Sequence, residues 1–247
     1  MDYERNLAYF VKKYTLGYIG IGVTAFFLIL YLILDNATKG AANTVFTLVM
    51  LAGIIAGIVV MCKGFGGRSD EENLDIQVRY FTKDDVAAAQ KKLHVGDYML
   101  RLTKFTSFGG YDFNGPEEFY AKRGKDNKLR STIYTSTQVL TFSERFYAYK
   151  KRMSLVDPDF ESEEIYIKTY DQIEKAEMRD TDYAYLPPLS KPEDKPENIV
   201  LHNLVISFTD GSELVIPSED NMDVDNVIKS VAQYKRSGSM NNGYENE

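Results

Sequence analysis

The stretch YTLGYIGIGVTAFFLILYLIL, residues 14–34, holds no ionisable group except tyrosine, and AANTVFTLVMLAGIIAGIVVMC, residues 41–62, holds none before its final cysteine. A helix needs about 20 apolar residues to cross the ~30 Å hydrocarbon core of a bilayer, and both stretches reach that length. Buried helices of a soluble core are the alternative, but such helices usually keep a polar face. The sequence therefore predicts an integral membrane protein with spans at 14–34 and 41–62.

Basic residues gather at the outer ends of this predicted hairpin. They are Arg5, Lys12 and Lys13 before the first span and Lys63 and Arg68 after the second. The connection of residues 35–40 holds a single lysine offset by an aspartate. Because Lys and Arg are retained on the cytoplasmic side, we expect a two-span protein of the cell membrane with both termini in the cytoplasm and an uncleaved first span.

Glycines lie in the cytoplasmic half of both spans, at Gly17 and Gly20 in the first and at Gly53 and Gly57 in the second. Small residues let helix backbones approach closely in a membrane. This face either packs the two spans together or mediates self-association, and both interpretations remain open. The spans contain no Asp, Glu, Lys, Arg or His, the residues that usually mark an ion path, so a transporter acting alone is not expected.

The chain after the spans is acidic. Residues 64–247 hold 33 acidic and 24 basic side chains. This balance argues against nucleic acid as a partner and against a broad electrostatic grip on anionic lipid. Cys62 is the single cysteine of the chain, which excludes an intramolecular disulfide and suits a reducing compartment.

Residues 64–97 are predicted to link the membrane hairpin to a folded domain. A glycine-rich and then acidic tether covers residues 64–73, followed by a short strand in which Ile76, Val78 and Tyr80 alternate with polar residues, and by a helix that opens at Thr82. From residue 98 the pattern changes to short β segments. These are residues 99–108, 117–122, 130–142, 146–155, 164–170 and 173–178, and they predict an antiparallel sheet or barrel.

The last hairpin is the best specified part of this domain. A three-residue loop of Thr209, Asp210 and Gly211 pairs Ile206 with Leu214 and keeps the apolar residues on one face, whereas a two-residue turn would divide them between both faces. A helix then follows, because Val224, Val227, Ile228 and Val231 recur at helical spacing. The tail of residues 237–247 lacks apolar periodicity, and we expect it to be disordered.

This order of elements resembles a known family. Several antiparallel strands, a hairpin of the type NLVISFTDGSELVIP and an amphipathic helix, DVDNVIKSVAQY, are similar to the bacterial pleckstrin-homology-like domains, in the wider class that includes GRAM domains. The segments TIYTSTQVLTFS and EEIYIKTYDQIEKAE resemble the middle strands of that family. The resemblance covers residues 98–236 and implies a split antiparallel β-barrel capped by the terminal helix, often beside membrane spans, that binds proteins or lipid head groups. It carries over no site residue.

One insertion departs from that family. Residues 180–197, DTDYAYLPPLSKPEDKPE, hold four prolines, which oppose strands and favour an extended exposed loop. The loop is either plain solvated chain or a docking peptide for a partner.

Basic residues cluster around one predicted turn of the domain. They are Lys122, Arg123, Lys125, Lys128 and Arg130. In pleckstrin-homology-like domains a loop between early strands can hold a phosphorylated head group, so these residues are a candidate site for phosphate or anionic lipid. Ordinary surface charge is the alternative.

Enzymatic chemistry is not predicted. The histidines are His94 and His202, and the sequence shows no metal-ligand spacing, phosphate loop or nucleophile elbow. We therefore expect no catalytic residue, cofactor or metal. The hypothesis from sequence is a membrane-anchored cytoplasmic module that recruits or senses a protein or lipid partner at the inner leaflet. The alternative is an accessory subunit of a larger membrane complex, of transporter or secretion type, that uses the hairpin as its interaction surface.

Overall fold

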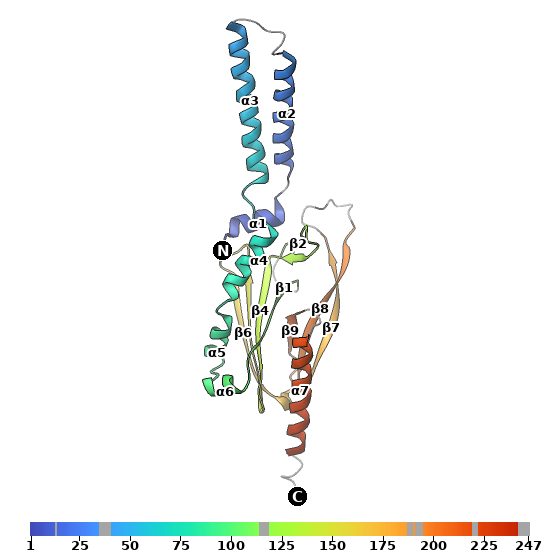
Figure 1. Cartoon of the computed structure of the whole chain (residues 1–247). Coiled ribbons are helices and arrows are strands. Elements are labelled where there is room, and N and C mark those ends of the chain that lie inside the picture. Colours follow the sequence, from blue (N-terminus) through green and yellow to red (C-terminus); the bar gives the residue numbers. More distant parts are fainter. Residues whose placement is uncertain are drawn as a thin grey trace. The chain divides into compact units, whose positions relative to one another are not determined.

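The computed structural model describes residues 1–12, 14–34, 41–113, 119–186, 190, 195–218 and 222–241. Its contacts divide the chain into two compact units, Glu4–Asp70 on the one hand and Glu71–Glu247 with Met1–Tyr3 on the other. The first unit is helical, and the second combines helices with antiparallel sheets (Figure 1).

The helical unit contains α1 (Tyr3–Val11), α2 (Thr15–Leu34) and α3 (Ala41–Phe65). The helices α2 and α3 run side by side and expose most of their large apolar side chains (Figure 1). Both are long and apolar enough to cross a membrane, as the sequence predicted.

The helix α1 was not predicted, because it is short and directly precedes the first apolar stretch. Side chains in and directly after α1 make hydrogen bonds to the end of α3 and to the chain that follows it. The Ser69 hydroxyl donates a 2.5 Å hydrogen bond to the Asn6 side chain, and the Lys12 ammonium group donates to the carbonyl oxygens of Lys63 and Gly66. The side chain that directly follows α1 therefore satisfies the Lys63 carbonyl in the last turn of α3 and the Gly66 carbonyl just after it.

The second unit is built on two antiparallel sheets. One has the order β1-β4-β5-β6 and the other the order β7-β8-β9, and a short pair, β2-β3, stands apart from both. Their bounds are Thr106–Asp112 for β1, Ala121–Arg123 for β2, Leu129–Ser131 for β3, Ile133–Thr141 for β4, Arg145–Ser154 for β5, Glu161–Thr169 for β6, Ile173–Tyr185 for β7, Glu197–Phe208 for β8 and Glu213–Pro217 for β9. The described strands do not close into one barrel.

The main core lies between the two sheets and the terminal helix α7 (Met222–Asn241). Phe146 and Val139 from the first sheet meet Leu204 and Ile206 from the second, and Val227 of α7 joins them. The opposite face of the four-stranded sheet is covered by α4 (Glu71–Thr82), α5 (Asp85–Lys92) and α6 (Asp97–Leu102) (Figure 1). There Leu93 packs with Leu140 and Tyr149.

The hairpin β8-β9 confirms the predicted register. Ile206 lies opposite Leu214 and Leu204 opposite Ile216, and Gly211 has a φ of +81° in the turn. The predicted apolar stripe of the last helix is also confirmed, since Val224, Val227 and Val231 are buried. Both elements combine a periodic pattern of apolar residues with a turn or helix signal nearby in the sequence, and for this reason they could be predicted.

The strand predicted over residues 76–80 is wrong. These residues lie in α4, where Leu74 and Val78, four positions apart, are buried while Ile76 and Tyr80 are exposed. The helical period therefore outweighs the short alternation that suggested a strand. The predicted tether of residues 64–73 is shorter than expected, because α3 runs to Phe65 and α4 begins at Glu71.

Two further boundaries differ from the prediction. The helix expected from Thr82 begins at Asp85, because the Thr82 hydroxyl donates to the carbonyl oxygen of Val78 and so belongs to the end of α4. The strand expected over residues 99–108 is replaced at its start by α6, whose partly buried Met99 and Leu100 pack beside α5. The alternation begins only at Thr106.

The expected loop of residues 180–197 is partly strand. β7 continues to Tyr185 and β8 starts at Glu197, so the two form a long hairpin arm. Tyr185 is buried, and its hydroxyl accepts a hydrogen bond from the Arg123 N–H, which anchors the arm to β2. The tail expected to be disordered is helical as far as Asn241, and residues 242–247 lie outside the described residues.

Candidate binding groove

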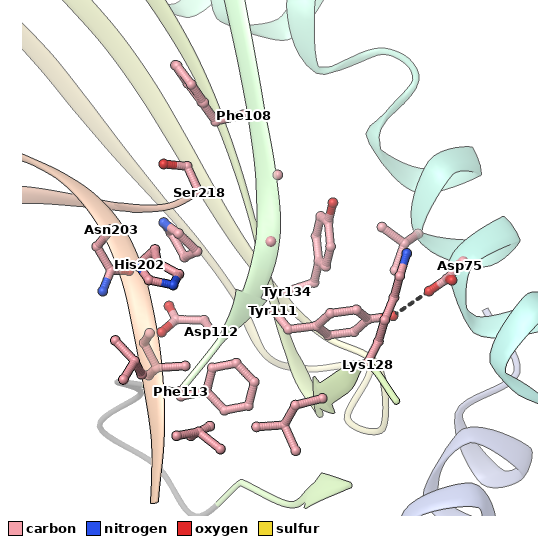
Figure 2. A pocket seen from close by; sticks show the side chains of 18 of the residues that line it. Asp75, Phe108, Tyr111, Asp112, Phe113, Lys128, Tyr134, His202, Asn203 and Ser218 are labelled. Carbon is pink, nitrogen blue, oxygen red and sulfur yellow. Dashed lines mark hydrogen bonds between the residues drawn. The ribbon is translucent and has the colours of Figure 1, made fainter. Parts of the chain in front are cut away.

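A groove of about 1190 Å³ runs along the strand β1. The helix α4 lines one side with Asp75, Val78 and Arg79, and the first half of β8 lines the other side. Figure 2 shows Tyr111 and other β1 side chains between Asp75 of α4 and His202 of β8. All of these elements belong to the Glu71–Glu247 unit.

The position of β1 at the edge of its sheet creates the groove. Phe108 points into the core, whereas Tyr111 points to the opposite face and reaches α4. At Gly110 the two sheets approach so closely that a Cβ atom would lie 2.8 Å from the Cβ of Pro217. A glycine at this position therefore lets β1 lie against the end of β9.

One buried arginine holds α4 against the sheets. Arg130 on β3 is only 1 % exposed, and its guanidinium group makes two hydrogen bonds to Asp75 and two to Asp126, between 2.7 and 3.1 Å long. The Tyr111 hydroxyl donates a 2.9 Å hydrogen bond to the same Asp75 carboxylate (Figure 2). These paired contacts are the strong, geometrically fixed kind that arginine forms with carboxylates.

The pKa values of this cluster follow its geometry. The hydrogen bond from Arg130 lowers the pKa of Asp126 to about 2. Burial alone would raise the pKa of Asp75, but hydrogen bonds from Arg130 and Tyr111 outweigh it and lower that pKa. Burial, together with the charge of Asp75, raises the pKa of Tyr111 far above its ordinary value. The cluster therefore holds two ionised carboxylates, a cation and a neutral phenol at physiological pH.

The other acids that line the groove are also engaged. Arg123 forms a 2.7 Å salt bridge with Glu197, and the Nε atom of Arg152 lies 3.0 Å from Asp112. By contrast, Arg79 and Lys128 are exposed and form no salt bridge with any residue in the described ranges. The groove therefore carries charges of both signs, and Arg79 and Lys128 are its exposed cations without a salt bridge to a described residue.

The structure does not leave the five cations of the predicted phosphate site in one exposed cluster. They all lie on or beside the β2-β3 hairpin, but Arg130 is buried by its two carboxylates and Arg123 faces Glu197. Lys122 is half-buried and has an interaction partner. Of the five, only Lys125 and Lys128 are exposed, so phosphate or lipid binding here remains a prediction.

The four glycines predicted to pack helices lie where α2 and α3 meet. A Cβ atom at Gly20 would overlap the backbone of Met61, and one at Gly57 would lie 2.7 Å from the backbone nitrogen of Thr24. A Cβ atom at Gly17 or Gly53 would strike an aromatic ring of the other helix, Phe65 or Phe27 respectively. Within one chain, these positions therefore serve the contact between α2 and α3.

Sequence reasoning missed Asp75 and Tyr111. Asp75 fell between the predicted tether of residues 64–73 and the strand wrongly predicted over residues 76–80, so its helical position was not considered. The available signal was the spacing of Leu74 and Val78, which indicates a helix with Asp75 beside its buried stripe.

No family model, curated protein or solved structure matches this chain. Across the described ranges, no three His, Cys, Asp or Glu side chains gather where they could hold a metal ion. The groove offers backbone edges and paired charges, and its geometry suits the binding of an extended ligand.

Proposed function

We propose that this protein is a non-enzymatic membrane module. In this proposal its two apolar helices anchor a cytoplasmic pleckstrin-homology-like domain that recruits a partner at the inner leaflet. The observation that carries the proposal is the groove along β1, in a unit joined to a hairpin whose helices are long enough to cross a bilayer. The order of four strands, three strands and a terminal helix supports the pleckstrin-homology-like assignment.

The charges of the groove favour binding over chemistry. Asp75, Asp112 and Glu197 each face an arginine at 2.7 to 3.0 Å, and no base stands beside a free nucleophile among these residues. A catalytic site usually keeps an acid or base whose pKa is poised for proton transfer. Here hydrogen bonds from Arg130 and Tyr111 lower the pKa of Asp75, and the salt bridges of Asp112 and Glu197 stabilise the walls of the groove.

A protein partner is favoured over an anionic head group. The most basic turn of the domain commits Arg130 and Arg123 to internal carboxylates, so a phosphate would have to bind to Lys125 and Lys128 at the surface. Such exposed lysines give weak, salt-sensitive attraction. Loss of inositol phosphate binding in a Lys125→Ala, Lys128→Ala double variant would revive the lipid proposal.

A test of the accessory-subunit alternative must leave the contact between α2 and α3 intact. Replacing Gly53 or Gly57 by leucine would separate α2 from α3, because these glycines lie at their contact. The exposed apolar residues, such as Ile29 and Leu48, are the ones available to a membrane partner.

The experiment compares the full chain with two variants after crosslinking in intact cells and purification in detergent. In one variant the exposed apolar residues of α2 and α3 exchange positions with one another, while the glycines stay in place. The other reverses the charges of Arg79 and Lys128. We expect a specific crosslinked protein that survives the first variant and is lost with the second. Survival in the second and loss in the first would overturn the recruitment proposal in favour of the subunit.

Carbonate extraction checks the anchor separately. An anchored chain stays in the membrane pellet at high pH and leaves it only with detergent. Release of the full chain into the aqueous fraction would overturn the membrane part of the proposal.

A further inference from the structure

The strand β1 presents an unpaired edge to the groove. Among the described strands it pairs with β4 alone, with Gly109 opposite Ser136 and Tyr111 opposite Tyr134. The Leu155 N–H bonds to the Thr132 carbonyl, so the even-numbered residues of the β4 strand direct their backbone groups to β5. The odd-numbered residues of β4 then bond to even-numbered residues of β1. The N–H and C=O groups of Gly109 and Tyr111 therefore face away from the sheet.

The facing wall is a second strand edge. β9 pairs with β8 only over residues 203–207, although β8 begins at Glu197. The Ser218 N–H bonds to the His202 carbonyl, which places the even-numbered residues of β8 on the β9 side. Asn198 and Val200, which line the groove, therefore turn their backbone groups away from β7, and Val200 is 50 % exposed.

Unpaired edges of this kind attract another strand, and proteins usually block them with charges, prolines or a covering segment. The sequence of β1, TSFGGYD, contains no proline and one charge, on Asp112, which is engaged by Arg152. Pro217 at the end of β9 packs against Gly110, and no described strand pairs with the free side of β1. The two glycines at its centre leave room for Tyr134 and Pro217 of the chain itself. The edge is thus suited to pairing.

The charge of the groove specifies the added strand further. Arg79 on α4 and Lys128 beside β3 line the groove and are exposed. Three acids of the lining, Asp75, Asp112 and Glu197, each have an arginine partner. A strand bound there gains from one acidic side chain pointing at these cations. A run of acidic residues would be repelled, because the domain as a whole is acidic.

We propose that the groove binds an extended segment of a partner protein, which adds as a strand to the free edge of β1 and directs one acidic side chain to Arg79 and Lys128. The proposal rests on the proposed recruitment function and names the chemistry of its partner. Backbone hydrogen bonds would supply affinity, and the acidic side chain would supply selectivity.

The test uses a display library of random eight-residue peptides, selected on the full chain in detergent. The decisive pair of variants is Gly109→Pro and Gly109→Ala. Both add a Cβ atom that meets the Tyr134 hydroxyl, but only proline removes the N–H that faces the groove, and neither touches the ladder to β4. Thermal denaturation first verifies that both variants fold.

We expect the enriched peptides to alternate apolar and polar residues around one Asp or Glu. Their affinity should fall about tenfold in the Gly109→Pro variant and stay within about twofold in Gly109→Ala. A Lys128→Glu variant should shift the selected charge from acidic to basic. Failure to enrich any peptide, or equal binding by the two Gly109 variants, would overturn the proposal.

A second copy of the chain is the competing occupant. Light scattering of the full chain in detergent that shows a dimer lost with Gly109→Pro would assign the edge to self-association and overturn the proposal. Survival of the crosslinked partner of the preceding section in Gly109→Pro cells would leave recruitment intact and reject only the strand addition.

Discussion

Asp85 is a buried carboxylate that the fold tolerates at a cost. It is 3 % exposed at the start of α5, and its Oδ2 atom has no hydrogen-bond partner in the described part of the chain. Burial raises the pKa of Asp85 above 3.8; a hydrogen bond from Ser136 and the charge of Lys151 offset part of this, while Glu161 adds to it. The folded chain therefore holds this proton more tightly than the unfolded chain, and stability falls as pH rises through the raised pKa.

Asp85→Asn should remove that penalty while keeping the acceptor for Ser136. We expect the variant to be more stable than the wild type at pH 7, by on the order of 1 kcal/mol, because an amide is cheaper to bury than a carboxylate. The gain should shrink to nothing near pH 3, where Asp85 is protonated in both states. Near-ultraviolet circular dichroism of the full chain in detergent, melted at several pH values, measures it. A gain that does not vary with pH would contradict the explanation.

Arg130 differs from Asp85 because all three nitrogen atoms of its buried guanidinium group have hydrogen-bond partners. Replacing it with methionine keeps much of its volume but leaves Asp75 and Asp126 without their shared donor. Both carboxylates are more than a third exposed, so water can solvate them, and we expect a loss of about 2 kcal/mol rather than the larger cost of a fully buried pair. Urea unfolding of the full chain measures the loss.

The acid sensitivity of the same variant supplies a second readout. The pKa of Asp126 is lowered to about 2 by its hydrogen bond with Arg130, so the stabilisation is complete above about pH 4 and is lost as pH falls through 2. Arg130→Met should therefore lose less stability than the wild type between pH 4 and pH 2. Lys125→Met, on an exposed side chain of the same hairpin, is the matched control and should behave as the wild type.

At the scale of elements, the contact between α2 and α3 can be probed with one methyl group. A Cβ atom at Gly20 would overlap the Met61 backbone, whereas one at Gly22 would meet open space. Gly20→Ala should destabilise the hairpin by roughly 1–3 kcal/mol, because the backbone cannot move aside as a flexible side chain can. Gly22→Ala should be neutral. Thermal aggregation of both variants in detergent measures the difference, and equal melting would contradict the packing.

Elements were predictable from sequence where the signal is local. The β8-β9 register follows from the alternation of Leu204 and Ile206 and from the turn at Gly211, and all of these residues lie close together in the chain. The two long apolar helices follow from composition alone. The helix α4 was not predicted because a strand-like alternation and a helical spacing of apolar residues overlap in the same few positions. The contact of Asp75 with Arg130, which fixes α4 on the domain, joins residues 55 positions apart.

The groove could not be predicted for a related reason. It lies between the edge of β1 and the edge of β8, which are about ninety residues apart in the chain. The sequence of a single strand does not indicate which strands lie beside it in a sheet. The basic turn was visible in the sequence, but of the carboxylates that engage its arginines only Asp126 lies in the turn, whereas Asp75 and Glu197 come from α4 and β8. Composition therefore located the charges without showing which of them stay available.

At the scale of the whole molecule, the proposed membrane anchor and the charge bias around α2 and α3 together predict that the β domain lies on the cytoplasmic side. Single-cysteine variants in a Cys62→Ala background test this with an impermeant thiol reagent. Tyr98→Cys, at a side chain 71 % exposed, should react only after the cells are lysed. Ala41→Cys, at the start of α3, should react in intact cells. The reverse pattern would place the groove outside the cell, where a cytoplasmic partner could not reach it, and reaction of both variants in intact cells would contradict a two-span anchor.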